Sequence, residues 1–361
     1  MKVLIITSFL RNMMPYLGKY EKILKKQNIE YDIILWDREK TDKIRKFNNE
    51  YIFSEKCPLG GKKILKISSY IKYRKEILKI LNTKQYDKII IFNTLPAIAI
   101  FDILLKKYKG NYLFDYRDYT YEKYKIYRFL VNNIIKNSYR TMISSKGFFK
   151  FLNSSKKISI THNIDKNIDS EKVSFSLKNL KKVTIGYVGL IRYESENKIL
   201  INKLQYSSKY ILKYVGKSYF DCNIEKYCKD NKIKNVFFCG EYNNDEKNHI
   251  YKNIDMINAI YGSKSYEVIT ALPNRLYDCL ILKKPIIVSD NTYLASVVKN
   301  NKIGIAIDLE KDKENIEKII DEYIEKFNEE EFYNNTNILL KKILNEENEA
   351  INKIKSFIED K

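Results

Sequence analysis

The residues best suited to bind a charged ligand follow an apolar run in GYVGLIRYESENK, residues 186–198. Gly186 and Gly189 flank the end of this run, and Arg192 and Lys198 lie beyond it. Glycine lets backbone amides approach a phosphate closely, and two nearby cations can hold the charge of a diphosphate. A strand-end turn with two solvated cations would show the same residues, because the segment is neither a Walker loop nor a complete GxGxxG motif.

A second segment of this kind is ALPNRLYDCLILKKPIIVS, residues 271–289. Pro273 suits the first turn of a helix, which places Asn274 and Arg275 at the positive end of that helix. Asp278 falls one turn later on the same face and could accept hydrogen bonds from ribose hydroxyls. A capped core helix with Asp278 merely exposed is the alternative interpretation.

A third segment, FDYRDYTYEKYK at residues 114–125, gathers Asp115, Arg117 and Asp118 at the end of another apolar run. Two carboxylates and a guanidinium could orient an acceptor hydroxyl, take up its proton or steady a leaving phosphate. We predict that these three residues are catalytic. A structural ion-pair cluster would show the same composition.

The elements that must position these residues alternate regularly along the chain. In the first half, short β-rich runs alternate with stretches of helical spacing, which predicts a parallel sheet covered by helices on both faces. The predicted strands are 3–7, 31–36, 88–92, 112–114, 141–144 and 158–161, and the predicted helices are 15–27, 64–81, 97–108, 123–136 and 146–152.

The alternation restarts in the second half, with predicted strands at 183–188, 211–215, 236–239, 256–260, 285–289 and 303–307. We therefore predict an α/β fold with a Rossmann-like domain at 1–170, a linker at 171–182 and a second Rossmann-like domain at 183–310. A charged helical segment, 311–361, is expected to pack back toward the first domain. Ligands of such sheets bind at the carboxyl ends of the strands, where the three segments lie.

In their order, these motifs resemble the retaining family 4 of GT-B glycosyltransferases, whose two doubly wound domains face a cleft. The family pattern places two glutamates eight residues apart before G-K-P and a strand; Asp278 matches the second glutamate, Lys284 and Pro285 match K-P, and Thr270 stands at the first. PNRLYD at 273–278 looks like the P-N-K-[LF]-[YF]-E version found in polysaccharide-assembly members. NAIYGSKS at 258–265, ISSKGF at 143–148 and ITHN at 160–163 resemble further elements of the family.

The resemblance implies a transfer from a nucleotide diphosphate sugar, a UDP-sugar being favoured, to a saccharide acceptor that is lipid-linked through polyprenyl diphosphate, in surface polysaccharide or capsule biosynthesis. Cations would replace a metal at the departing diphosphate, so neither a metal nor a cofactor is expected. The first loop of the family helps to bind acceptor, which implies this role for Arg11 and Asn12. The implied donor-binding residues are Gly189, Arg192, Lys198, Tyr261, Gly262, Asn274, Arg275, Leu276 and Asp278.

Charge is distributed unevenly along the chain. Residues 1–180 hold 37 Lys and Arg against 17 Asp and Glu, a net charge of +20, whereas residues 181–361 carry +1. A basic half suggests a polyanionic partner such as a bilayer surface, a phosphorylated substrate or nucleic acid, and a lysine-rich genome would give the same bias. The lysine pairs near Lys62 and Lys106 and the stretch 70–79 could form a membrane-facing surface or an ordinary solvated face.

The remaining composition limits the function classes. Five cysteines without a CxxC and only two histidines make a zinc framework implausible and suggest a reducing compartment. The start MKVLIITSFL is too short for a signal peptide, and no stretch approaches the roughly 18 apolar residues of a membrane helix. We expect a cytoplasmic protein, peripheral on the inner face of the cell membrane, in which His162 has a structural or hinge role.

Two other functions fit parts of the sequence. A nucleotide-sugar 2-epimerase of the same fold would need acid and base groups near the sugar, and the chain has only two histidines. A nucleic-acid-binding protein would use the basic half, but no helix-turn-helix, RRM or zinc motif occurs, so no nucleic acid is expected as partner.

Overall fold

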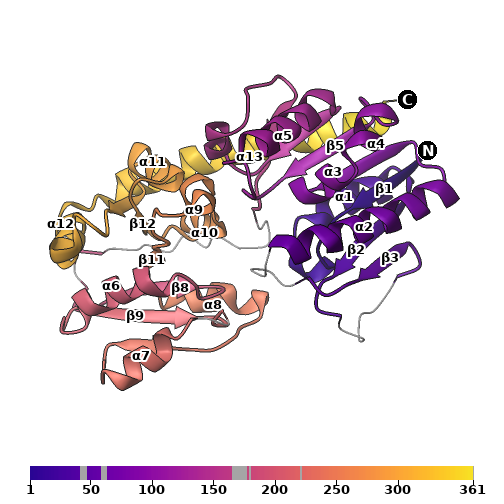
Figure 1. Cartoon of the computed structure of the whole chain (residues 1–361). Helices are drawn as coiled ribbons and strands as arrows, with labels where there is room; N and C mark the ends of the chain where they lie inside the picture. The colour runs from indigo at the N-terminus through magenta and orange to yellow at the C-terminus, as the bar shows by residue number, and fades with distance from the viewer. Residues whose placement is uncertain (41–46, 58–62, 165–176, 179, 220–221, 361) are drawn as a thin grey trace. The chain divides into compact units, whose positions relative to one another are not determined.

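The computed structural model describes residues 1–40, 47–57, 63–164, 177–178, 180–219 and 222–360. It divides into two compact units (Figure 1). Unit 1 comprises Met1–Asn163 together with Asn345–Lys361, and unit 2 comprises Ile164–Leu344. The predicted linker, 171–182, lies largely outside the described residues, so the predicted domain boundaries stay a prediction.

Unit 1 is built on a seven-stranded sheet in the order β3-β2-β1-β4-β5-β6-β7, with all neighbouring strands parallel. Helices cover both faces, so the central strands are apolar without alternation; all five residues of β4, KIIIF, are buried. The strands are β1 (Lys2–Ile6), β2 (Glu30–Asp37), β3 (Glu50–Ser54), β4 (Lys88–Phe92), β5 (Tyr112–Tyr116), β6 (Arg140–Ile143) and β7 (Ile158–Ile160).

Two hydrophobic layers lie on the two faces of this sheet. One is formed with α2 (Lys63–Thr83), α3 (Thr94–Ala99), α4 (Phe101–Lys106) and α5 (Lys125–Asn137). The other is formed with α1 (Leu17–Lys26) and the end of the long helix α13 (Glu329–Glu359). Two 3-10 turns, Arg11–Met13 and Lys146–Lys150, complete the unit.

A buried polar cluster fixes the end of α13 in unit 1. The carboxylate of Glu347 is 4% exposed and accepts hydrogen bonds from Lys19 Nζ at 2.8 Å, Thr161 Oγ1 at 2.9 Å and the backbone N–H of His162 at 2.7 Å. The His162 ring lies 2.9 Å from a carboxylate oxygen of Glu346. Buried charges need such partners, so the contacts support the structural role predicted for His162.

Unit 2 contains a six-stranded parallel sheet in the order β10-β9-β8-β11-β12-β13. Its strands are β8 (Val183–Val188), β9 (Tyr210–Val215), β10 (Val236–Phe238), β11 (Met256–Ala259), β12 (Ile286–Ser289) and β13 (Gly304–Ile307). Its helices are α6 (Glu194–Leu204), α7 (Ile224–Asp230), α8 (Lys247–Lys252), α9 (Tyr266–Thr270), α10 (Asn274–Leu282), α11 (Tyr293–Asn300), α12 (Ile316–Lys326) and the start of α13; two further 3-10 turns are Asn244–Glu246 and Lys313–Asn315.

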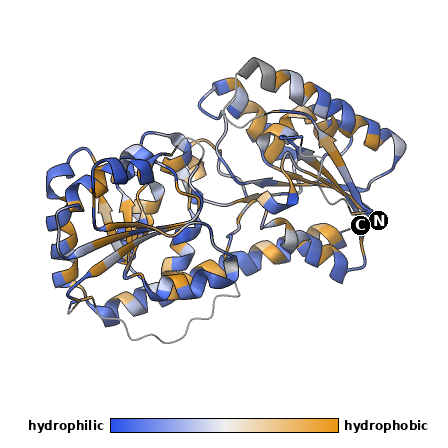
Figure 2. Cartoon of the chain, turned by 90° about the horizontal axis from the view of Figure 1, so that it is seen from below, coloured by the Kyte–Doolittle hydropathy of each residue, from blue (hydrophilic) through white to orange (hydrophobic). Residues whose placement is uncertain are grey.

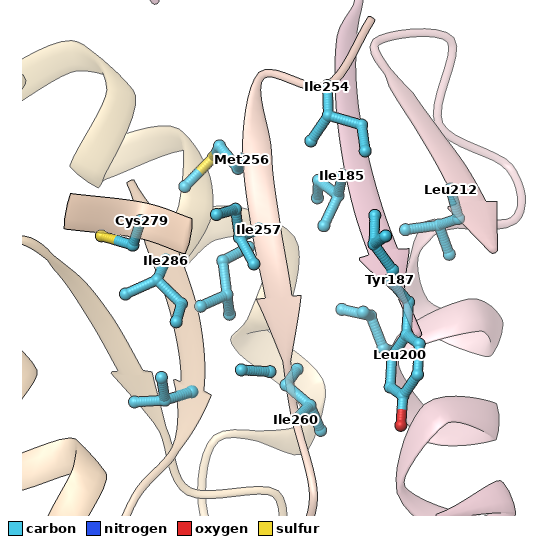
Figure 3. Packing of buried hydrophobic residues seen from close by; sticks show 14 of the residues in the cluster. Ile185, Tyr187, Leu200, Leu212, Ile254, Met256, Ile257, Ile260, Cys279 and Ile286 are labelled. Carbon is cyan, nitrogen blue, oxygen red and sulfur yellow. The ribbon is translucent and has the colours of Figure 1, made fainter. Parts of the chain in front are cut away.

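The core of unit 2 lies between this sheet and its helices. In Figure 3, Ile185 and Tyr187 of β8, Ile257 of β11 and Leu200 of α6 lie close together. Hydrophobic residues, orange in Figure 2, concentrate in the strands of each unit, and the helices combine hydrophobic and hydrophilic residues. Among the described residues no helix is long and apolar enough to cross a membrane.

The predicted fold class is confirmed: both halves form parallel sheets, and a long helix follows. Every predicted strand is present, but the edge strand β3 was missed. The predicted helix 97–108 is wrong in detail, because α3 and α4 are separated by Ile100, whose φ and ψ of −119° and 29° are not helical. The predicted helix 146–152 is a short 3-10 turn at Lys146–Lys150.

Candidate functional site

The strand order of unit 2 marks where a ligand should bind. β8 has β9 on one side and β11 on the other, so the chain leaves these neighbouring strands in opposite directions. Such a topological switch point opens a crevice at the carboxyl ends of the strands. The loops that follow β8 and β11 carry four of the nine predicted donor-binding residues, and the other five lie on α6 and α10.

Glycines with positive φ follow four adjacent strands at this end of the sheet. Gly189, Gly216, Gly240 and Gly262 come after β8, β9, β10 and β11 and have φ of 113°, 134°, 70° and 78°. A Cβ on Gly216 would lie 2.2 Å from the carbonyl oxygen of Gly189. The loops after β8 and β9 are therefore in direct backbone contact, which only glycine permits. The sequence analysis singled out Gly189 and Gly262 but missed the other two.

Arg275 is the central cation of this region. It is 5% exposed, donates from Nε to the carbonyl oxygen of Val188 at 2.9 Å and from Nη1 to the Tyr261 hydroxyl at 2.5 Å. Its guanidinium lies 3.4 Å from the centre of the Tyr187 ring. Burial alone would lower its pKa, but the oxygens of Tyr261 and Tyr187 raise it above the ordinary value, so the group is charged.

No described carboxylate forms an ion pair with Arg275. Its Nη2 lies 3.7 Å from where a Cβ on Gly189 would stand, so the buried charge is next to the glycine loop after β8. A buried cation is costly without an anion, and tyrosine rings supply only part of that compensation. The switch point is therefore electropositive and suited to an anionic ligand.

A cavity of about 570 Å³ opens beside this loop, lined by Tyr193, Glu194, Ser195, Lys198 and Cys222. Tyr193 begins α6 in the left-handed conformation, with φ 60° and ψ 55°, and its ring lies 4.8 Å from that of Tyr261. Bulky residues adopt this conformation rarely, and such strain concentrates at functional sites.

The two predicted diphosphate cations are placed differently. Arg192 is exposed and lies over the Tyr219 ring at 5.0 Å. Lys198 is half-buried and pairs with Glu194 at 2.6 Å, and this hydrogen bond lowers the pKa of Glu194. A ligand phosphate would therefore compete with Glu194 for Lys198, whereas Arg192 faces no such competition from its aromatic neighbour.

Asp278 is buried one turn into α10. Its Oδ1 accepts a hydrogen bond from Lys247 Nζ at 2.6 Å, and its Oδ2 accepts one from Tyr251 at 2.8 Å. Each carboxylate oxygen has a second lone pair, so these bonds fix the orientation of Asp278 and still leave acceptor capacity. Lys247 and Tyr251 were not identified from the sequence, because nothing in their spacing relates them to Asp278.

The other predicted donor-binding residues differ in their surroundings. Asn274 is exposed at the start of α10. The backbone N–H groups of Tyr261 and Gly262 donate hydrogen bonds to Ser289 Oγ at 3.1 and 2.8 Å. Leu276 is fully buried in the core, so its side chain packs within unit 2.

Thr270, which stands at the family's first glutamate, does not reach the surface. It is 1% exposed and donates to the carbonyl oxygen of Tyr266 at 2.8 Å. Glu267, one turn earlier on α9, is exposed, and its charge raises the pKa of Tyr193, after the larger effect of burial, to about 12. A carboxylate thus lies near the loop after β8, displaced along the helix from the predicted position.

Unit 1 brings Asp115 and Arg117 together as a buried ion pair at the end of β5. Asp115 is fully buried, lies 2.6 Å from Arg117 Nε and accepts a hydrogen bond from Tyr20. The Arg117 guanidinium lies 4.3 Å from the Tyr16 ring. Asp118 is exposed, so it is the member of the predicted catalytic group that a solvent-borne substrate can reach.

Asn93, which the sequence analysis missed, ends β4 next to this cluster. Its φ is 66°, its side chain is 8% exposed, and neither atom of its amide has a hydrogen-bond partner of good geometry among the described residues. The sheet of unit 1 has its own switch point between β1 and β4. A buried amide with a strained backbone at such a point is a candidate ligand contact.

The predicted acceptor residues lie in the turn after β1. Arg11 is held by two carboxylates, Glu21 and Glu50, with Nε 2.9 Å from Glu50 Oε1. Asn12 is exposed in the same turn. Among the described residues no three His, Cys, Asp or Glu side chains are grouped to hold a metal ion.

One family model matches part of the chain. Residues 169–337 match the family model described as glycosyl transferases group 1. No curated protein matches the chain by sequence.

Solved structures match almost the whole chain at low sequence identity. Sucrose-phosphate synthase from Thermosynechococcus elongatus is 12% identical with a TM-score of 0.68 over 98% of both chains. The lipopolysaccharide outer core galactosyltransferase WaaB is 13% identical with a TM-score of 0.65 over 99% of both chains. Anabaena HepE in complex with UDP and glucose is 13% identical with a TM-score of 0.64, over 99% of this chain and 100% of HepE. At these identities the likeness shows the fold.

Proposed function

We propose that the chain transfers a sugar, with retention of configuration, from a nucleotide diphosphate sugar to a saccharide acceptor, because residues 169–337 match the model for glycosyl transferases group 1 and the fold is GT-B. A UDP-sugar is the favoured donor, because the related fold of HepE is described with UDP and glucose. The acceptor is proposed to be lipid-linked, in surface polysaccharide assembly at the inner face of the membrane.

The observation that carries this proposal is the buried charge of Arg275 at the switch point of unit 2. Arg275 lies next to Gly189 without a carboxylate partner among the described residues, and Arg192 and Lys198 follow on the same loop and helix. Cations held in a partly dry site stabilise the charge that develops on a departing diphosphate. In this assignment Arg192 and Lys198 contact the diphosphate, and the buried charge of Arg275 contributes a positive electrostatic potential.

The remaining donor contacts follow from the same end of the sheet. Asp278, oriented by Lys247 and Tyr251, would accept hydrogen bonds from ribose hydroxyls. The start of α10 at Asn274 and the loop at Tyr261 and Gly262 would contact phosphate and sugar. We assign to Glu267 the sugar contact that Thr270 cannot make.

Unit 1 is proposed to bind the acceptor. Asp118 would contact the acceptor hydroxyl, and Asp115 and Arg117, which are buried, would position the loop. In a retaining transfer the departing phosphate can take the acceptor proton, so a buried base is not required. Arg11 and Asn12 stay proposed acceptor contacts, with the charge of Arg11 already shared by Glu21 and Glu50.

The experiment that tests the donor assignment is a thermal-shift series with UDP, GDP, dTDP and CMP and their sugars, on the wild type, Arg192→Ala and Lys198→Ala. A ligand at 100 times its Kd adds about 2.7 kcal/mol of stability, which shifts Tm measurably. The control is Lys229→Ala, which removes a cation from an exposed pair with Glu225 on α7. We expect one nucleotide class to raise Tm in the wild type and the control and to do so weakly in the other two variants.

Two results would contradict the proposal. If no nucleotide raises the Tm of the wild type, the donor-site assignment is refuted. If a nucleotide raises the Tm of all variants equally, the donor binds elsewhere. The acceptor part is tested separately by incubating the chain with the selected nucleotide sugar and a lipid extract. Mass spectrometry should then show a lipid-linked saccharide lengthened by one sugar. If the lengthened saccharide carries no lipid, the lipid-linked assignment is refuted.

A further inference from the structure

Unit 1 contains an apolar cavity of about 600 Å³ that the proposed chemistry does not use. It is lined by side chains of α2, α3 and the segment that leads into α5, whose helices are neighbours in Figure 1. The lining includes Ile67 and Ile71 from α2, Leu95 and Ile98 from α3, and Tyr121 and Tyr124 before α5. A cavity of this size can hold part of a hydrocarbon chain.

Two of the polar side chains in the wall, Arg74 and Tyr127, already have hydrogen-bond partners. The Arg74 guanidinium binds both carboxylate oxygens of Asp102, at 2.6 and 2.9 Å, and the carbonyl oxygen of Ala99 at 2.7 Å. The Tyr127 hydroxyl donates to Thr94 at 2.6 Å. The cavity therefore offers apolar surface and little capacity to bind a sugar or a phosphate, which would need unpaired donors.

Large apolar side chains on α2 and α5, two helices that contribute residues to the cavity wall, face solvent. Ile67 and Ile71 are 62% and 53% exposed on α2, and Ile126 and Phe129 are 79% and 66% exposed on α5. We call these four residues the apolar rim. Exposed large apolar residues on helices that share an apolar cavity indicate an interaction surface.

Cations flank the apolar rim. Residues 123–137, which include the whole of α5, contain Lys123, Lys125, Arg128 and Lys136 and no Asp or Glu. Apolar side chains that project among cations are typical of surfaces that bind anionic lipid, because the apolar groups enter the acyl boundary while the cations meet the headgroups. The charge beside the rim thus favours an anionic bilayer over a neutral partner.

We propose that the apolar rim docks the chain on an anionic phospholipid bilayer and that the cavity receives one hydrocarbon chain of a lipid. This inference rests on the proposed function, because it names the surface by which a transferase for lipid-linked acceptors reaches the membrane. It keeps part of the candidate surface of the sequence analysis: Ile71 of the stretch 70–79 belongs to the apolar rim, whereas Tyr73 and Ile77 of that stretch are buried and Lys62 lies outside the described residues.

Vesicle co-sedimentation of the full chain tests the docking. Vesicles of phosphatidylcholine are compared with vesicles that also contain phosphatidylglycerol, for the wild type and for the double variant Ile126→Asn/Phe129→Asn. Burial of either side chain in lipid contributes enough for the double variant to lose about tenfold or more in vesicle affinity. The control is Ile338→Asn, which removes an equally exposed isoleucine, 67%, from unit 2 and should bind as the wild type does.

The charge contribution is tested with Lys125→Gln/Arg128→Gln, which should lower the affinity for anionic vesicles about fivefold per cation and leave neutral vesicles unaffected. If Lys125→Gln/Arg128→Gln lowers vesicle affinity and the apolar double variant does not, the chain only adsorbs electrostatically to the vesicle surface. That result would overturn the proposal. A change of oligomeric state in the apolar double variant without a change in vesicle binding would show that a second copy covers the rim, and would overturn it as well.

Entry of a hydrocarbon chain into the cavity has its own readout. Trp36, the only tryptophan, packs on Tyr70, which lines the cavity, with ring centroids 4.8 Å apart. Phospholipids with brominated acyl chains should quench Trp36 fluorescence in the wild type and less in the apolar double variant. Docking without quenching would refute occupation of the cavity. The thermal shift with nucleotide, measured on the same variants, should be unchanged, so failure of docking and failure of the donor assignment are separable.

Discussion

Gly216→Ala is the sharpest test of the donor site, because it changes one methyl group that no ligand need touch. Gly216 follows β9 with φ of 134°, a conformation that side chains rarely adopt. The new Cβ would stand 2.2 Å from the carbonyl oxygen of Gly189, whereas real Cβ atoms essentially never approach closer than 3.0 Å. The Gly189 carbonyl must therefore move by about 0.8 Å, and the loop that carries Arg192 moves with it.

The size of the effect follows from the two parts of this change. The unfavourable backbone conformation costs about 1–3 kcal/mol. For a unit of this size each kcal/mol lowers Tm by roughly 2–4 °C, so we expect a loss of roughly 2–12 °C. A displacement near 1 Å at a positioning loop can cost about 100-fold in rate, so kcat/KM should fall by about that factor.

The matched control is Gly240→Ala. Gly240 follows the next strand, β10, with φ of 70°, and a Cβ there would have no atom within 4 Å. This variant carries the conformational cost without the clash, so it should lower Tm while donor binding and kcat/KM stay close to those of the wild type.

The assay is steady-state transfer from the donor selected by thermal shift, with unfolding followed by circular dichroism on the same samples. If Gly216→Ala and Gly240→Ala lower Tm to a similar extent and both keep a kcat/KM close to that of the wild type, the loop after β8 does not hold the donor. The assignment of Arg192 and Lys198 would then fail together with it.

Two further predictions concern buried carboxylates. Asp278→Asn removes the carboxylate charge that pairs with Lys247. Because breaking a buried ion pair costs about 3–5 kcal/mol, we expect urea denaturation to show a large fall in the free energy of unfolding. Calorimetry should show nucleotide binding weakened at least about tenfold. Burial raises the pKa of Glu346, but hydrogen bonds from His162 and Lys146 outweigh it and lower that pKa from 4.5 to about 2. Its stabilisation is therefore complete above pH 4.5 and is lost as pH falls toward 2, by on the order of 1 kcal/mol after allowance for solvent screening. Urea denaturation between those pH values should show a steeper loss for the wild type than for Glu346→Gln, and equal slopes would refute this linkage.

The fold was predictable because parallel strands buried on both faces leave continuous apolar runs. β4 and β5 have this pattern, and their bounds come out within two residues. β3 does not, since only Glu50 of its five residues is buried at the edge of the sheet. The break at Ile100 was equally hidden, because Leu104 and Ala97 keep helical spacing across it.

Residue type allowed candidate site residues to be named from the sequence. Arg192, Lys198 and Asp278 were selected because cations and a carboxylate after strands fit a nucleotide diphosphate, and their roles stay predictions. What the sequence could not supply is the environment that decides their roles: Lys247 reaches Asp278 from another helix, and Glu194 pairs with Lys198. Such partners come together only when the chain folds, so pattern and spacing do not identify them.

The charge distribution shows that the net charge of a segment does not locate the candidate ligand site. The excess of +20 lies in residues 1–180, yet Arg275, the buried cation proposed to support donor binding, lies in the half whose net charge is +1. Exposed lysines are screened beyond a Debye length of about 8 Å, so they act together on an extended anionic surface and weakly on one small ligand. A buried guanidinium is screened far less and can act strongly on a single phosphate. Net charge therefore indicates the proposed membrane-docking surface, and burial indicates the proposed diphosphate site.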